Sequence, residues 1–387
     1  MVAAEIPRQP AADGSRKFAR IDVGGPRSDR APQRGRGDGG RLGDFIERQV
    51  SGMSAMAPTA AAADALGKWA SLATEWRGRV SPATVVRVEE PLGPKTTLRV
   101  GGAARVYAEP AGLADLQSLL RAAGTSGVAV FPLGRGSNLI VPDEGVDGLV
   151  VSLAHEVWSS CEVRAGGRIW AGAGLRLKHL CGVAARAGLA GFEFLEGIPG
   201  SVGGALRMNA GAMGGWIFDL VEEALMISLA GELATRSRAS LRAGYRACPD
   251  LDDAIALGAL LRAPSGAAAE EPGAPATGVE AIARQTDVYR RKRQESQPKE
   301  PSAGCIFQNP PGTTAGRLID ECGLKGLRIG GAEVSPVHAN FLVNRGGATS
   351  GEVLELIRRV RARVREVKGV ELQPEAILYG RKWEDVW

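Results

Sequence analysis

A thiol that could deliver a proton lies in residues 301–310, whose sequence is Pro-Ser-Ala-Gly-Cys-Ile-Phe-Gln-Asn-Pro. Prolines at both ends and Gly304 directly before Cys305 indicate a fixed loop whose backbone can approach a ligand closely. Taken alone, such a segment is more often an ordinary turn with a half-buried cysteine. A catalytic role for Cys305 therefore depends on what the rest of the chain provides.

Two glycine-rich segments could provide backbone contacts to a ligand. In residues 133–139, Gly134 and Gly136 allow successive N–H groups to form an anion-binding nest. The segment is not a Rossmann fingerprint, because Leu139 takes the place of the third glycine and no helix follows directly. Residues 197–212 contain apolar side chains that a flexible linker lacks, so we interpret them as a wall against a flat cofactor.

Three predicted units position these segments. A short helix ending near Trp76 precedes a β-α-β unit that begins near residue 90, and the later units span 159–262 and 300–380. An exposed loop at 263–278 and a basic helix at 279–297, a candidate phosphate contact, lead into the Cys305 segment. Predicted strands lie at 103–108, 128–132, 148–153, 168–171, 218–229, 338–344 and 370–379, and predicted helices at 113–124, 175–188, 315–322 and 350–368.

The third unit has a clear helix start. Thr349 and Glu352 are spaced as a capping box, and Gly369 ends the helix that follows. We expect this helix and the strands around it to form a second β-α-β-like arrangement. Its buried stripe comprises Val353, Ile357, Val360, Val364 and Val367.

Composition limits the class of protein. A chain of 387 residues with 44% hydrophobic residues and a net charge of +5 indicates a protein of two or three domains that could bind anionic ligands. Five cysteines without CxxC spacing indicate reduced thiols in a cytosol, and scattered histidines make a metal site improbable. The sequence has no apolar run of about 18 residues and no signal-peptide pattern, so we expect no membrane insertion.

The first 60 or so residues are rich in Arg, Gly, Pro, Asp and Ala and contain few aromatics. Such a segment cannot bury enough apolar surface to fold, so we predict a disordered tail. An RNA-binding arm around residues 34–36 is the alternative, but interleaved acidic residues favour a solvated tail.

The order of these motifs resembles that in the UDP-N-acetylenolpyruvoylglucosamine reductase family, flavoenzymes of peptidoglycan precursor synthesis. The resemblance extends from about Val88 to Gly380, and the tail has no counterpart in it. The motifs are Gly134–Asn138, Gly197–Gly211, Gly244-Tyr245-Arg246, the Cys305 segment, Ile329–Ser335 with His338–Phe341, and Leu372–Glu375. The short link between Arg246 and Cys305 is similar to that of the family's shorter second type.

The resemblance implies an α+β fold with a two-subdomain FAD-binding module of the vanillyl-alcohol-oxidase or p-cresol-methylhydroxylase type, followed by a C-terminal α/β substrate domain. The implied regions are a poorly ordered extension at 1–80, FAD subdomains at 88–156 and 157–265, a loop and basic helix linker at 266–299, and the substrate domain at 300–382.

The implied reaction reduces an enolpyruvyl ether to a lactyl ether with FAD and NADPH as cofactors. Charge builds on the substrate carboxylate, so Arg246 and Glu375 would stabilise it and Cys305 would donate the proton. The implied cofactor-binding residues are Gly134, Arg135, Gly136, Ser137, Asn138, Leu139, Ile198, Pro199, Gly200, Ser201, Gly203, Gly204, Asn209 and Gly211. The implied substrate-binding residues are Tyr245, Asn309, His338 and Asn340.

Three positions depart from the family pattern. Cys305 stands where serine is commonest, and a free thiol with a pKa of about 8.5 is a much stronger acid than a hydroxyl. We expect Arg246 to lower that pKa, so activity should fall at alkaline pH. Ile377 replaces a basic residue, which removes one ligand contact, and Cys248 replaces a serine as a small buried side chain.

The resemblance implies a cytoplasmic monomer that binds a UDP-sugar enolpyruvyl ether and NADPH, with no nucleic-acid partner. Two alternatives stay open: another flavin oxidoreductase of the same fold that acts on a different small substrate, or a non-enzymatic nucleotide- or RNA-binding protein. Yellow protein with absorbance near about 450 nm would separate the flavoenzymes from the last alternative.

Overall fold

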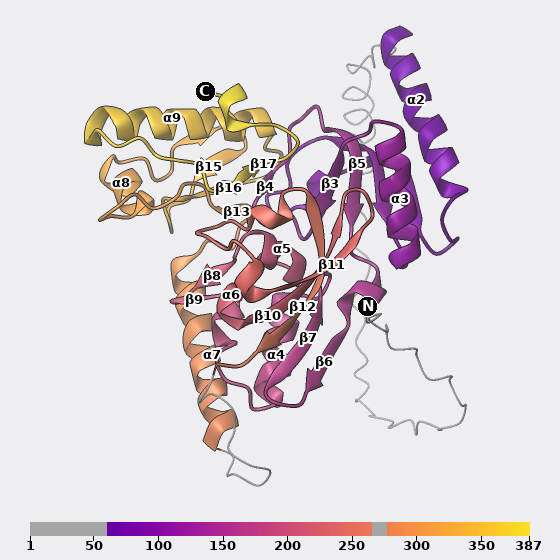
Figure 1. Ribbon diagram of the computed structural model, residues 1–387. Helices are drawn as coiled ribbons and strands as arrows, with labels where there is room; N and C mark the ends of the chain where they lie inside the picture. The colour runs from indigo at the N-terminus through magenta and orange to yellow at the C-terminus, as the bar shows by residue number, and fades with distance from the viewer. Residues whose placement is uncertain (1–59, 265–276) are drawn as a thin grey trace, which may run out of the picture. The chain divides into compact units, whose positions relative to one another are not determined.

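The computed structural model describes residues 60–264 and 277–387 (Figure 1). The predicted tail at 1–59 and most of the predicted loop at 263–278 lie outside the described residues. Three sheets organise the described part, and each carries its own helices.

The first sheet has the strand order β1-β2-β5-β3. Its elements are α2 (Ala60–Arg77), β1 (Val85–Pro91), β2 (Ala103–Glu109), α3 (Leu113–Thr125), β3 (Val130–Leu133) and β5 (Val146–Ser152). Strands β2, β3 and β5 are parallel, which confirms the predicted β-α-β unit. The prediction of a poorly ordered extension up to residue 80 is wrong for α2, because Ala73 and Trp76 are fully buried against this unit.

The second sheet is antiparallel throughout, with the order β11-β10-β12-β7-β6. Its strands are β6 (Cys161–Arg164), β7 (Arg168–Gly172), β10 (Val221–Ser228), β11 (Leu233–Ser237) and β12 (Ala254–Arg262). The predicted strand at 218–229 therefore begins at Val221, after the short helix α6 (Ile217–Leu220). Strands β6, β11 and β12 were not predicted.

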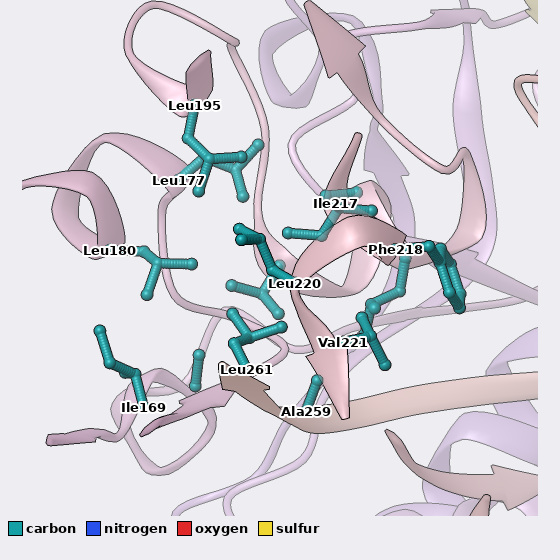
Figure 2. Packing of buried hydrophobic residues seen from close by; sticks show 14 of the residues in the cluster. Ile169, Leu177, Leu180, Leu195, Ile217, Phe218, Leu220, Val221, Ala259 and Leu261 are labelled. Carbon is teal, nitrogen blue, oxygen red and sulfur yellow. The ribbon is translucent and has the colours of Figure 1, made fainter. Parts of the chain in front are cut away.

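Helices cover one face of the second sheet. Leu177 and Leu180 of α4 (Leu177–Arg186) pack towards Leu220 and Leu261, as Figure 2 shows. The glycine-rich run contains a further short helix, α5 (Val202–Arg207), which was not predicted. The predicted basic helix is α7 (Thr277–Ser296), which contacts α4.

The third sheet has the order β13-β16-β15-β14, and all its pairings are antiparallel. Its elements are β13 (Ser302–Cys305), α8 (Ala315–Glu321), β14 (Arg328–Ile329), β15 (Ala332–Val334), β16 (Phe341–Asn344) and α9 (Ser350–Lys368). The predicted β-α-β-like arrangement is therefore wrong. The predicted strand at 370–379 shortens to β17 (Ile377–Leu378), which pairs in parallel with β4 (Leu139–Ile140) instead of joining this sheet.

Helix α9 starts and ends as its sequence predicts. The Thr349 hydroxyl accepts a hydrogen bond from the Glu352 N–H, the capping box is complete, and Gly369 adopts a φ of 66° at the end of the helix. Four residues of the predicted stripe are buried, but Val367 is 44% exposed because it lies in the last turn beyond the sheet.

Hydrogen bonds fix the third sheet to the first unit. The Asp143 carboxylate accepts from the N–H groups of Ser350 and Gly351 at 2.8 and 2.9 Å, where α9 begins. Asn344 donates to the Leu98 carbonyl at 3.1 Å. Within residues 60–264 and 277–387, none of the helices combines the length and apolar character needed to cross a membrane.

Candidate active site

A cavity of about 1840 Å³ opens where the three sheets meet. Its wall includes residues 134–139, part of the run 197–211, Arg246, Cys305 and Glu375. Pockets for one small molecule usually measure about 300–1,000 Å³, so this cavity has room for a dinucleotide and a second ligand.

The loop after β3 forms one wall and is locked in place. Gly136 has a φ of 59°, and a Cβ on it would lie 2.7 Å from the Thr96 Cα, so only glycine fits. The Thr97 N–H also donates to the Gly136 carbonyl at 3.2 Å. The backbone of the loop can therefore face a ligand without an intervening side chain.

The glycine-rich run forms the opposite wall and touches the first. A Cβ on Gly134 would lie 3.2 Å from the Ser201 hydroxyl, and one on Gly203 would lie 3.0 Å from the Ala173 Cβ. All predicted cofactor-binding residues except Asn209 line the cavity. Asn209 instead donates to the Gly244 carbonyl at 2.9 Å, so it holds the turn that carries Arg246.

The three predicted catalytic residues come together on the cavity wall. The Arg246 Nε donates to the Glu375 carboxylate at 2.7 Å, and its Nη1 donates to the Gly211 carbonyl at 3.2 Å. Cys305 ends β13, and the carbonyl of the next residue, Ile306, accepts from the Glu375 N–H at 2.7 Å. One peptide group therefore sets the spacing between the thiol and the carboxylate.

Burial, followed by the nearby Glu375 carboxylate, raises the pKa of Cys305 to about 12. Arg246 and Arg293 oppose this shift but do not overcome it. The expectation that Arg246 would produce a thiolate at alkaline pH is therefore wrong, because desolvation dominates and Arg246 is already paired with Glu375. The thiol stays protonated across the neutral range.

None of the four predicted substrate-binding residues is among the residues that line the described cavity, and their role stays a prediction. Tyr245 comes nearest, since its hydroxyl donates to Glu375 at 3.2 Å. Asn309 accepts from the Ala315 N–H at 3.0 Å and so caps α8. His338 packs edge-on against Phe341, and burial lowers its pKa.

The fourth of these residues, Asn340, is 2% exposed and forms hydrogen bonds to the backbone of Phe307.

The structure also places Ile377 and Cys248, two of the residues that depart from the family pattern. Ile377 lines the cavity, and its N–H donates to the Asn138 carbonyl at 2.9 Å. Cys248 is fully buried, and burial raises its pKa, which confirms the interpretation of a small core side chain.

Arg293 and Arg176 line the cavity, although neither was among the predicted site residues. Arg293 projects from α7, its Nη1 donates to the Gly197 carbonyl at 3.3 Å, and its buried Nε has no partner among the described residues. Burial, followed by the charge of Arg246, lowers the pKa of Arg293. The basic pattern of α7 was visible in the sequence, but the neighbouring Arg290 instead pairs with Glu196.

The second of these residues, Arg176, precedes α4, and its backbone forms an isolated antiparallel β-bridge with Ser201. Burial, followed by the charge of Arg176, lowers the pKa of Arg135 on the facing loop. Two guanidinium groups that repel each other beside glycine backbone favour an anionic ligand such as a pyrophosphate. The cavity therefore fits a dinucleotide cofactor.

Known proteins with similar sequences share this organisation. A family model described as the C-terminal domain of UDP-N-acetylenolpyruvoylglucosamine reductase matches residues 297–379, and one described as an FAD binding domain matches residues 104–236. A reductase of that name from Geobacter metallireducens is 41% identical over 315 residues, which are 81% of this chain and 98% of the relative.

Further relatives agree. A reductase of the same name from Bradyrhizobium sp. is 42% identical over 76% of this chain and 92% of its own length. The crystal structure of the enzyme from Thermus caldophilus is 39% identical, covers 76% of this chain and 100% of its own, and has a TM-score of 0.64.

Proposed function

The chain belongs to the UDP-N-acetylenolpyruvoylglucosamine reductase family, and on that premise we propose how its residues carry out the reaction. It is an FAD-containing oxidoreductase that reduces UDP-N-acetylglucosamine enolpyruvate to UDP-N-acetylmuramate with NADPH. A flavin oxidoreductase with another substrate and a non-enzymatic nucleotide- or RNA-binding protein are not favoured.

The residues that line the cavity fit FAD. The glycine walls at Gly134–Gly136 and Gly200–Gly204 would hold FAD, with Arg135 and Arg176 near its pyrophosphate. Bound FAD supplies hydride transfer from NADPH to the terminal carbon of the enolpyruvyl group, which no side chain can do. The protein must then stabilise charge on the substrate carboxylate and deliver one proton.

Arg246 supplies the positive charge at the substrate carboxylate, and Glu375 is its positioning partner. Glu375 and the Gly211 carbonyl fix the guanidinium, so Arg246 is held in place before negative charge develops. Arg293, whose buried Nε has no hydrogen-bond partner within the described part of the chain, adds a second cation to the same wall. Neither cation has to reorganise during the reaction.

Cys305 donates the proton to the carbon that bears the ether oxygen and the carboxylate. The new C–H bond forms as the S–H bond breaks, the S–H electron pair stays on sulfur, and solvent later reprotonates the thiolate. The observation that carries this assignment is the Ile306 peptide, which holds Cys305 beside Glu375 on the cavity wall. The raised pKa of Cys305 keeps the donor protonated between turnovers.

We also propose regions and a setting for the enzyme. The FAD-binding subdomains are 88–156, extended by α2 and β1, and 157–265, linked by 266–299 to the substrate domain at 300–382. The enzyme would act as a cytoplasmic monomer of the shorter second type, whose free cysteines suit a reducing compartment.

The test follows the flavin directly. Purified protein should be yellow, NADPH should bleach it without oxygen, and UDP-N-acetylglucosamine enolpyruvate should then restore the colour and yield UDP-N-acetylmuramate. Folded protein that is colourless, or flavin that the enolpyruvyl ether fails to reoxidise, would contradict the proposed function.

A further inference from the structure

Asn340 lies directly behind the loop that carries Cys305. Its main-chain carbonyl accepts from the Ile306 N–H at 2.9 Å. Its side-chain oxygen accepts from the Phe307 N–H at 3.0 Å, and its amide nitrogen donates to the Phe307 carbonyl at 2.8 Å. Three hydrogen bonds from one residue therefore hold the two residues that follow the thiol.

The amide group of Asn340 has one more donor to give. An amide nitrogen carries two hydrogens, and one of them is used by the Phe307 carbonyl. The Asn340 side chain also acts on the thiol, because its hydrogen bonding lowers the pKa of Cys305 against the larger effect of burial. Asn340 thus holds the loop and influences the thiol.

The opposite side of the loop is held by the backbone N–H groups of Glu375 and Ala376. The Ile306 carbonyl accepts from Glu375 at 2.7 Å and from Ala376 at 3.3 Å. The loop is therefore bonded on one side to Asn340 and on the other to the segment of Glu375. Loss of the two Asn340 side-chain bonds would loosen only the side of the loop that is remote from the carboxylate, where the main-chain bond from the Ile306 N–H to the Asn340 carbonyl remains.

We propose that Asn340 is a positioning residue that aims the Cys305 thiol at the substrate, a role that rests on the proposed function of Cys305. We assign this role to Asn340 in place of the substrate contact expected from the sequence, because its side chain is almost fully buried. A misplacement of about 1 Å can cost about 10²-fold in rate, so a loosened loop should slow the proton transfer.

A purely structural role is the competing explanation, because a buried asparagine that satisfies backbone groups also stabilises a fold. The two roles differ in one respect. If Asn340 acts through Cys305, its replacement should matter only while Cys305 is present. A structural loss would add to the effect of any other substitution.

The experiment is a double-mutant cycle on flavin-loaded full-length protein. Asn340→Asp keeps the shape and the acceptor but loses both amide donors, and Asn340→Ala removes all side-chain bonds. Each is combined with native Cys305 and with Cys305→Ala. Reoxidation by the enolpyruvyl substrate, bleaching by NADPH and urea unfolding are measured for every variant.

A matched control comes from the same strand. Asn344 is also buried, and its side chain bonds to the backbone, including the Leu98 carbonyl and the Gly346 N–H. Its bond to the Cys305 segment comes from its main-chain N–H, which donates to the Pro301 carbonyl at 2.9 Å and which an alanine at this position keeps. Asn344→Ala should lower the urea midpoint, as Asn340→Ala does, and leave reoxidation within about twofold of the native rate.

With Cys305 present, we expect either Asn340 variant that folds to reoxidise at least about tenfold more slowly, with bleaching by NADPH within about twofold. With Cys305→Ala, we expect less than about twofold further change from either Asn340 variant. Equal losses in both backgrounds, or native rates in a folded variant, would overturn the role of Asn340. If Cys305→Ala alone leaves reoxidation intact, the proton-donor assignment fails, and the role of Asn340 fails with it.

Discussion

Replacement of Arg246 by lysine should slow reoxidation of the flavin by the enolpyruvyl substrate. The substitution keeps the positive charge and retains the same backbone demand, because Arg246 has a φ of 53° and lysine would occupy it at equal cost. What changes is the planar fork, which donates to Glu375 and to the Gly211 carbonyl at once.

The magnitude follows from those two contacts. One ammonium cannot reproduce both bonds, and a lost hydrogen bond to a charged group costs about 1.5–3 kcal/mol. The side chains of Arg246 and Glu375 are 25% and 10% exposed, so partial screening favours the lower half of that range. A loss of about 1.5–2 kcal/mol corresponds to about a 10- to 30-fold slower reaction.

Stopped-flow absorbance of flavin-loaded protein measures this rate at saturating substrate. Arg242→Lys is the matched control, because Arg242 is 72% exposed and pairs with Asp250 on the surface. The control should stay within about twofold of the native rate. An Arg246→Lys enzyme that also stays within about twofold would refute the role assigned to the guanidinium.

Three other predictions concern the thiol and the cofactor loop. Because the pKa of Cys305 is raised to about 12, reoxidation should show no alkaline decline from this group between pH about 8 and 10, and a decline centred near its free pKa of about 8.5 would contradict the burial argument. The same shift makes stability depend on pH, because the unfolded chain releases the Cys305 proton near pH about 8.5 and the native protein only near about 12. The contribution of Cys305 to the free energy of unfolding is therefore full below pH about 8.5 and falls as the pH rises towards about 12. The free energy of urea unfolding should decline less steeply over this pH range in Cys305→Ser. Gly136→Ala should lose bound flavin, because its Cβ would lie 2.7 Å from the Thr96 Cα, whereas Gly304→Ala, with nothing nearer than 3.9 Å, should cost only about 1–2 kcal/mol of backbone strain. Equal flavin-to-protein absorbance ratios in the two alanine variants would contradict the packing of the loop.

The glycine-rich segments could be predicted as cavity walls because the need for glycine is visible locally, whereas the roles of Arg246 and Glu375 came from the family resemblance and stay predictions. Two glycines within residues 133–139 and a thiol beside small residues are each visible in one short segment. Long periodic helices such as α9 were predicted within a residue for the same reason. Short strands such as β6 and β11, whose residues are largely exposed, carry no buried alternation and were missed.

Properties that depend on distant partners could not be predicted. Arg290 and Arg293 are three residues apart on α7, yet one pairs with Glu196 and the other lines the cavity, which only the docking of the helix decides. The pKa of Cys305 depends on burial that residues 301–310 do not encode. Asn340 was predicted to bind substrate because its motif resembles the family's, but its position behind Phe307 gives it another contact.

The central claim is that Cys305 delivers the proton, and its replacement by alanine tests that claim most directly. General acid catalysis contributes about 10²–10⁴-fold, so reoxidation by UDP-N-acetylglucosamine enolpyruvate should slow by at least about 100-fold in Cys305→Ala. Bleaching by NADPH should persist in that variant, because it requires no proton from the thiol, and Cys305→Ser should retain measurable turnover. Reoxidation of the Cys305→Ala enzyme at the native rate would contradict the account.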